Sequence, residues 1–190
     1  MSFRHLVGAA LGLALWIVPA GAAVTISFYA HHLGSKGMWV EFPHAYVTLT
    51  GAPDAGGPSV KANYGFTPPK IGPSILFGRV DGEVDSVDDA YIAKDIPYFS
   101  FALSDSQYAA VLATVTRWRD DAQPSYELDT HNCVIFVKEI AAAAGLRTGT
   151  DDPFVRDPAH FLTDLRERNA AFLTRTDTRL AGASLSANRR

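Results

Sequence analysis

Cysteine is the scarcest residue in this 190-residue chain, which contains only Cys133. A lone cysteine excludes an internal disulfide, so two explanations remain for it. Cys133 is either a small apolar core residue or a thiol that is kept for its reactivity. The chain also lacks a cysteine pair at ligand spacing and a His-Glu-x-x-His run, two patterns that indicate a metal site.

The sequence offers few candidate metal ligands. The residues that could supply them are His31, His32 and the acidic cluster Asp85, Asp88 and Asp89. Adjacent histidines on a strand point to opposite faces, and an acidic cluster of this kind is typical of a solvated loop. We expect no metal.

A strong charge of one sign is absent as well. The 17 Lys and Arg residues stand against 20 Asp and Glu residues, a net charge of −3. This mild acidity gives no reason to expect nucleic acid as a partner. The glycines at 51, 56 and 57 indicate turns, because no phosphate-binding or dinucleotide-binding pattern surrounds them. We therefore expect no cofactor.

Only one long hydrophobic run is present, from Leu6 to Val18. Pro19 ends it, and Ala20-Gly21-Ala22 follows with the small-x-small pattern that signal peptidase recognises. These features predict a signal peptide over residues 1–22 and an exported protein, periplasmic or secreted. A retained membrane anchor is the alternative, although a spanning helix needs about 20 apolar residues.

The rest of the chain has the size of one domain, which we place at residues 23–173. Residues 174–190 lack apolar periodicity and predict a flexible C-terminal tail. The arginines of this tail could contact anionic lipid headgroups, which leaves open a peripheral membrane contact beside the simpler interpretation of a solvated terminus. The sequence does not indicate an oligomeric state.

The first half of the domain carries the period-two alternation that predicts strands. The expected strands are residues 24–31, residues 39–42 with 44–50, residues 59–66, a short hairpin over 75–84 and residues 98–103. Residues 44–50 and 59–66 form a hairpin across a Gly- and Pro-rich connection. In the first strand, alternation places Val24, Ile26, Phe28 and Ala30 on one face.

Helical periodicity begins at Ser104, which forms a predicted capping box with Gln107. A second helix starts near residues 130–132 and ends before Gly145. Asp157-Pro158 opens a third, with aspartate as the cap and proline at the first helical position. Strands in the first half and helices in the second predict an α+β fold.

Cys133 lies in the expected first turn of the second helix, on its apolar side. The unpaired backbone N–H groups of a first turn favour the thiolate, so we expect the pKa of this thiol to be lowered. The same N–H groups could hold an oxyanion beside the sulfur. A buried, inert cysteine on the apolar stripe is the competing interpretation.

A reactive thiol needs a base, and His44 is the best placed of the six histidines. It begins a strand, and Pro43 stiffens the approach to it. Asn63 on the returning strand is expected near His44, where its amide oxygen could orient the imidazole. His131 is the competing base, although a residue two positions before Cys133 points elsewhere on a helix.

The run Asn132-Cys133-Val134-Ile135-Phe136-Val137 resembles the Asn-Cys-x-x-Phe-Val signature of the lecithin:retinol acyltransferase-like proteins. These proteins belong to the circularly permuted branch of the NlpC-type papain-like superfamily. The strand from His44 to Gly51 is similar to the histidine strand of that branch, and the order of histidine before cysteine also matches. The resemblance covers approximately His44 to Gly145.

The resemblance implies a permuted papain-like fold, with an antiparallel sheet packed against helices and the cysteine at a helix N-terminus. It implies a cysteine hydrolase or acyltransferase that forms a thioester, with Cys133 as nucleophile, His44 as base and Asn63 as the orienting residue. Substrates would be cell-wall peptides or lipid and lipoprotein acyl chains. The other hypothesis is a non-catalytic module of the cell envelope that keeps the fold with Cys133 buried and inert.

Overall fold

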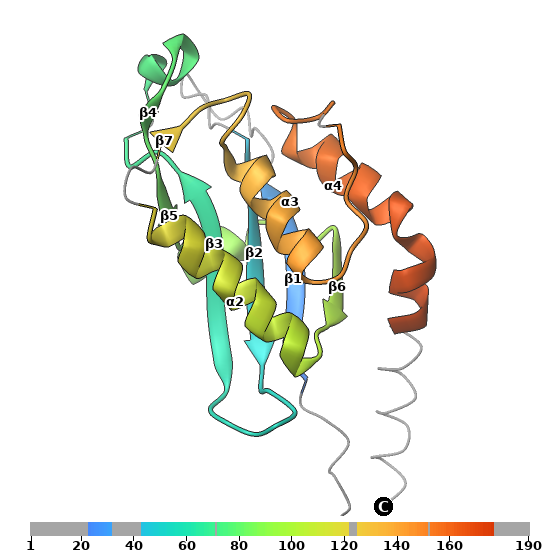
Figure 1. The fold of residues 1–190 in the computed structure, drawn as a ribbon. Helices are drawn as coiled ribbons and strands as arrows, with labels where there is room; N and C mark the ends of the chain where they lie inside the picture. Colours follow the sequence, from blue (N-terminus) through green and yellow to red (C-terminus); the bar gives the residue numbers. More distant parts are fainter. Residues whose placement is uncertain (1–22, 32–42, 71, 122–124, 152, 177–190) are drawn as a thin grey trace, which may run out of the picture.

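In the computed structural model, which describes residues 23–31, 43–70, 72–121, 125–151 and 153–176, five antiparallel strands form the main sheet. Their order is β5-β3-β2-β1-β6 (Figure 1). The strands are β1 (Thr25–His31), β2 (His44–Gly51), β3 (Val60–Thr67), β5 (Glu83–Asp85) and β6 (Phe99–Ala102). The predicted hairpin of β2 and β3 is confirmed, with Gly51 opposite Val60.

One face of this sheet forms the hydrophobic core. The alternating residues of the segment 24–31 that are predicted to share a face are all at most 2% exposed, as are their neighbours on β2. They are Val24, Ile26, Phe28, Ala30, Ala45, Val47 and Leu49. Period-two alternation thus identified the buried face of the strands correctly.

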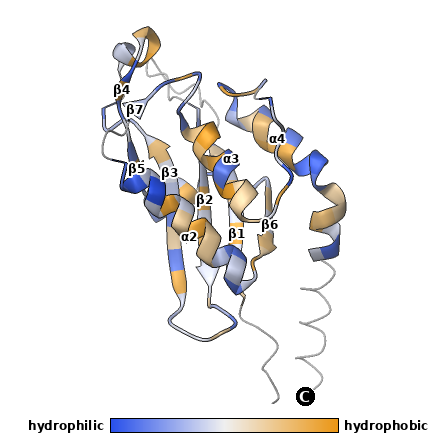
Figure 2. Cartoon of the chain, in the orientation of Figure 1, coloured by the Kyte–Doolittle hydropathy of each residue, from blue (hydrophilic) through white to orange (hydrophobic). Residues whose placement is uncertain are grey.

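Three helices cover the core face: α2 (Asp105–Arg119), α3 (Cys133–Ala143) and α4 (Pro158–Arg168) (Figure 1). In Figure 2, α3 is mostly hydrophobic, whereas α2 and α4 mix hydrophobic and hydrophilic residues. This difference fits the position of α3 between the other two helices. The molecule is therefore an α+β protein whose antiparallel sheet packs against helices, as the sequence predicted at this level.

The helix ends follow the predicted capping chemistry. Ser104 and Gln107 form the full capping box of α2. The Asp157 carboxylate accepts from the His160 N–H at the start of α4. Beyond α3, Gly145 has φ +89°, a left-handed conformation that glycine adopts without the steric cost of a side chain.

The predicted hairpin over residues 75–84 is wrong. Pro73–Phe77 is a 3₁₀ helix, η1, and the two strands after it belong to different sheets. β4 (Val80–Asp81) pairs with β7 (Ser125–Tyr126), whereas β5 pairs with β3. Only Gly82 separates β4 from β5, too short a connection for a hairpin, and the free edge of β3 recruits β5 instead.

The acidic cluster is exposed to solvent, as predicted, but it is not a loop. Asp85 is the last residue of β5, and Asp88 caps the short helix α1 (Asp89–Ile92) by accepting from the Tyr91 N–H at 2.7 Å. Asp89 lies in the first turn of α1, where a carboxylate is favoured by the helix dipole.

Several predicted segments lie outside the described residues: the signal peptide over 1–22, the extended run 39–42, His32 and most of the tail. Residues 170–176 are helical, so the tail predicted from residue 174 begins as helix. In the described part of the chain, no helix has the length and hydrophobicity needed to span a bilayer.

Candidate active site

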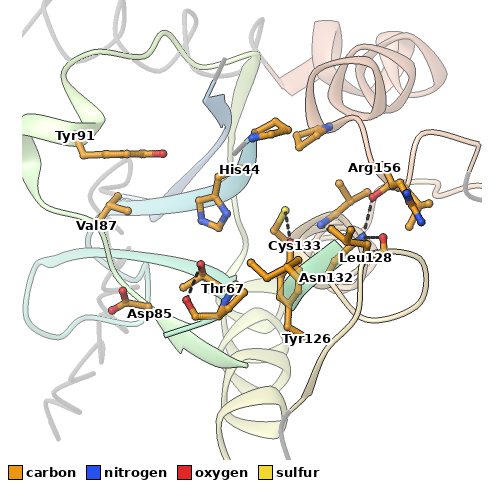
Figure 3. A pocket seen from close by; sticks show the side chains of 16 residues that line it. His44, Thr67, Asp85, Val87, Tyr91, Tyr126, Leu128, Asn132, Cys133 and Arg156 are labelled. Atoms are coloured by element: carbon orange, nitrogen blue, oxygen red, sulfur yellow. Dashed lines mark hydrogen bonds between the residues drawn. The ribbon is translucent and has the colours of Figure 1, made fainter. Parts of the chain in front are cut away.

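A cavity of about 220 Å³ opens at the end of the sheet where β2 begins and β3 ends. Most of its lining is apolar, including prolines, valines, Ile75 and Leu128. The polar residues that reach it come from elements that are far apart in the sequence (Figure 3). They are His44, Thr67, Asp85, Tyr91, Tyr126, Asn132, Cys133 and Arg156. The cavity therefore brings together Cys133 and His44, the two residues predicted to form a catalytic pair.

Cys133 is the first residue of α3 and is 3% exposed. The Asn132 side chain caps this helix by accepting from the N–H groups of Val134 and Ile135 at 2.8 and 3.0 Å. An asparagine cap of this kind begins the helix sharply and fixes where the next side chain points. Figure 3 shows the sulfur directed into the cavity.

Asn132 also anchors the rim of the cavity. Its Nδ2 donates to the carbonyl oxygens of Leu128 and Val155 at 2.5 and 2.8 Å. The side chain is 2% exposed, and its oxygen and nitrogen both have partners. Because one amide ties α3 to two loops, the shape of the cavity depends on Asn132 as well as on the thiol.

Burial raises the pKa of the Cys133 thiol above its ordinary value. The backbone N–H of Ala45, the Tyr126 hydroxyl and the N–H groups of the first turn all act in the opposite direction, but burial outweighs them. The prediction of a lowered thiol pKa is therefore wrong for the free protein. The N–H groups of a helix N-terminus stabilise a thiolate, but here the hydration that the thiolate would lose on burial outweighs them.

His44 is half-buried at the start of β2, and its ring lies over Gly65 of β3. A Cβ at Gly65 would lie 2.4 Å from Nε2 of His44, so the absence of a side chain there makes room for the imidazole. Burial, followed by the neighbouring His31, lowers the pKa of His44 to about 4, although Asp85 and Asp95 raise it. The imidazole is therefore neutral at neutral pH and able to accept a proton.

The two residues reach the cavity from opposite sides of the sheet. Ala45 belongs to the core face that α3 covers, so alternation places the side chain of His44 on the other face. The sulfur of Cys133 lies beside the Ala45 N–H. His44 and Cys133 line one cavity because it lies at the end of the strands, where both faces are accessible.

The structure does not bring Asn63 to His44. The register places Asn63 opposite Thr48, four residues along β2 from His44 and about 13 Å away at strand spacing. The Asn63 side chain forms two hydrogen bonds with the backbone of Val87, at 2.9 and 2.7 Å. Asn63 therefore holds the segment after β5 and does not line the cavity.

His131, the competing base, is also outside the cavity lining. Its ring stacks on Trp118 with centroids 4.1 Å apart, and Nδ1 lies 2.5 Å from the carbonyl oxygen of Ser125. These contacts give His131 a packing role between α2 and β7.

A second polar cluster lies beside His44. Nδ1 of His31 is 3.0 Å from Oδ1 of Asp95, and the Tyr46 hydroxyl donates to Oδ2 of Asp95 at 2.9 Å. His31 is the register partner of His44 on β1. Sequence reasoning missed this cluster because Asp95 carries no motif and reaches the sheet only through the tertiary fold.

Sequence reasoning also missed Asp85 as a cavity residue. The sequence predicts a loop at Asp85, because nothing in residues 81–85 indicates that β5 joins the edge of β3. Within the described residues, no group of three or more His, Cys, Asp and Glu side chains is arranged to hold a metal ion.

Comparison with protein-family models, with curated proteins and with solved structures found no match to this chain. The function of the protein is therefore inferred from the cavity and its residues.

Proposed function

We propose that this protein is an exported cysteine hydrolase or acyltransferase that acts on an amide or acyl bond at the cell envelope. The observation that carries the proposal is the shared cavity of Cys133 and His44, which come from elements far apart in the sequence. The finer fold that we propose is the permuted papain-like one, with Cys133 at the N-terminus of its helix. The signature around Cys133 and the histidine-first order support this assignment.

In the proposed reaction, the neutral imidazole of His44 takes the proton of the Cys133 thiol as the sulfur attacks the substrate carbonyl. The new carbon–sulfur bond gives a tetrahedral oxyanion, and the N–H groups at the start of α3 are the nearest backbone donors for it. When the carbon–leaving group bond breaks, the leaving group takes the proton from His44. Water or an acyl acceptor then cleaves the resulting thioester.

The electrostatics of the free protein favour the neutral pair. The thiol pKa is raised and the imidazole pKa is lowered, so proton transfer from sulfur to nitrogen is uphill before substrate binds. A site of this kind becomes reactive when a bound carbonyl draws charge from the sulfur into the oxyanion. The predominantly apolar lining favours an apolar acyl group or side chain beside the reacting bond.

The second candidate is a non-catalytic envelope module in which Cys133 is inert. The 3% exposure of Cys133 and its raised pKa favour this alternative. The two hypotheses can be distinguished by measurement, because the reactivity of an inert Cys133 thiol would not depend on His44.

The test is covalent acylation of the full chain by p-nitrophenyl acetate, followed by intact mass and by peptide mapping of the modified residue. We expect one acetyl group on Cys133, and none in a Cys133→Ser variant. His44→Ala should slow acylation by about 100-fold, the ordinary contribution of a general base, while His131→Ala should leave the rate within twofold.

A wild type that shows no acylation of Cys133 would refute the proposal, and two further outcomes would contradict it. The first is a Cys133 acylation rate that is the same in the wild type and in the His44→Ala variant. The second is a loss of acylation in His131→Ala with His44→Ala unaffected, which would identify His131 as the base. Circular dichroism of each variant separates these results from a loss of fold.

A further inference from the structure

We infer that Asp85 is the positioning residue of the proposed catalytic pair: from β5, across Gly65, it orients the imidazole of His44 so that Nδ1 is left to take the thiol proton. This inference rests on the proposed function, because the orientation of His44 matters only if His44 is the base for Cys133. It concerns a residue that sequence reasoning assigned to a solvated loop.

The register of three strands places Asp85 on the same face as His44. Tyr46 of β2 is opposite Gly65 of β3, and Gly65 is opposite Asp85 of β5. Residues directly opposite each other in an antiparallel pair share a face, and His44 shares that face with Tyr46 by alternation. Asp85 and His44 both line the cavity.

Gly65 separates these two side chains and has none of its own. The atom of His44 nearest to a Cβ built at Gly65 is Nε2, at 2.4 Å, followed by Cε1 at 3.0 Å. Nε2 is therefore the ring nitrogen turned toward β3 and, beyond it, β5. In Figure 3 Cys133 lies on one side of the imidazole of His44, and Asp85 lies on its other side, beyond Thr67.

The carboxylate of Asp85 is held in place at one oxygen. Oδ1 accepts from the Ser86 N–H at 2.7 Å, and Asp85 lines the cavity from its exposed rim. The negative charge of Asp85 favours the protonated imidazole of His44 and so raises its pKa, without a direct hydrogen bond between the two side chains. Such contacts are often long in a free enzyme and shorten when substrate closes the site.

The other polar groups around His44 are less suited to this role. His31 on β1 and Asp95 after α1 are paired with each other at 3.0 Å, and Tyr46 on β2 donates to Asp95. His31 and Asp95 act on His44 with opposite signs, His31 lowering its pKa and Asp95 raising it.

Tyr91 also lines the cavity, but its ring packs against His31 and Tyr46, with centroids 4.6 and 5.9 Å apart. Two other neutral residues are alternatives. The Thr67 hydroxyl on β3 donates to the carbonyl oxygen of Pro68 at 3.4 Å, and Asn63 is bonded to the backbone of Val87. Of these two, only Thr67 lines the cavity, which makes it the matched control.

The experiment uses the full chain labelled with ¹⁵N, and the His44 signals are assigned by their loss in His44→Gln. We expect the wild type at neutral pH to hold the proton on Nε2. In Asp85→Ala the tautomer preference should weaken, and the His44 titration midpoint should fall because a neighbouring negative charge is lost. Asp85→Glu should restore most of both signals, and Thr67→Val should change neither.

The kinetic readout is Cys133 acylation by p-nitrophenyl acetate. Asp85→Ala should slow it by roughly three- to tenfold, the effect of about one pKa unit or less in the base. Because Asp85 is exposed at the rim, its attraction to His44 should be screened by salt, whereas buried Asp95 should be insensitive. In the wild type, raising NaCl to about 0.5 M should therefore lower the His44 midpoint, a measurement that needs no variant.

The inference is overturned if Asp85→Ala leaves both the tautomer and the midpoint of His44 unchanged, or if Thr67→Val reproduces its effects. Should Asp85→Ala lose its fold, a salt-independent wild-type midpoint overturns the inference instead. The nuclear magnetic resonance measurements do not require turnover. A wild type that shows no acylation therefore refutes the proposed function, while Asp85 is still judged by the His44 signals.

Discussion

Replacing Gly65 by alanine should damage the site without damaging the fold. Gly65 lies within β3, and a Cβ built there would be 2.4 Å from Nε2 of His44 and 3.4 Å from Cβ of Tyr46. The second distance is an ordinary van der Waals contact. The first is not, so the imidazole must move by about 1 Å to restore the same separation.

The two effects of this change have different magnitudes. The imidazole is the free end of a side chain at the edge of a cavity, so it can rotate away at little cost in folding free energy. Alanine also loses less conformational entropy than glycine within a strand, which favours the folded state by about 0.5–1 kcal/mol. Catalysis is less tolerant, because a misplacement of about 1 Å can cost roughly 100-fold in rate.

We therefore expect Gly65→Ala to keep or slightly raise the free energy of unfolding and to lower the Cys133 acylation rate by about 100-fold. Gly72→Ala is the matched control, since its backbone is extended and a Cβ there would meet no atom within 4 Å. Urea unfolding and acylation by p-nitrophenyl acetate measure the two quantities. An unchanged acylation rate in a folded Gly65→Ala variant would refute the reasoning that His44 needs this position.

Three further predictions concern stability and the thiol. The pKa of His44 is about 4 in the folded protein against 6.5 for a free histidine, so the unfolded chain binds more protons between these values and stability should fall as the pH drops from 6.5 to 4. In His44→Gln this loss of folding stability should be smaller by about 2 kcal/mol, as measured by urea unfolding at pH 6.5 and at pH 4. An equal loss of stability in the variant and the wild type would contradict this prediction. Tyr126→Phe removes a hydroxyl that donates to Sγ of Cys133 at 3.9 Å, so the midpoint of iodoacetamide reactivity against pH should move upward, and a downward shift would be the contrary result. Ser104→Ala removes half of the capping box of α2 and should cost about 1 kcal/mol in thermal unfolding, with acylation unchanged; a larger loss of acylation than of stability would show that α2 contributes to the site.

Local patterns in the sequence were sufficient to predict most of the helices and strands. The capping box at Ser104, the Asp157-Pro158 start and the alternation of β1 each depend on residues close together in the chain. The failure at residues 75–84 has the opposite cause. Two short strands with little apolar periodicity were assigned to each other, although each had a better partner elsewhere in the fold.

Some residues of the candidate site could likewise be predicted from local sequence, and others could not. Cys133 could be located from its own helix, because an asparagine cap and an apolar stripe are local features. His44 could be proposed from the start of its strand. The third position could not be located, because the choice between Asn63 and Asp85 depends on the register of β2 with β3 and on the pairing of β5. A slip of a few residues in a hairpin connection moves a polar side chain by about 3.3 Å for each residue.

The sequence by itself determined the α+β class, the buried face of the strands, the starts of the helices and the lone thiol in a first turn. These depend on periodicity and capping, which act over a few residues. Only the tertiary structure decided the protonation of the site. Burial reversed the expected direction of the Cys133 pKa and lowered that of His44, because the cost of desolvating a charge depends on every element packed around it.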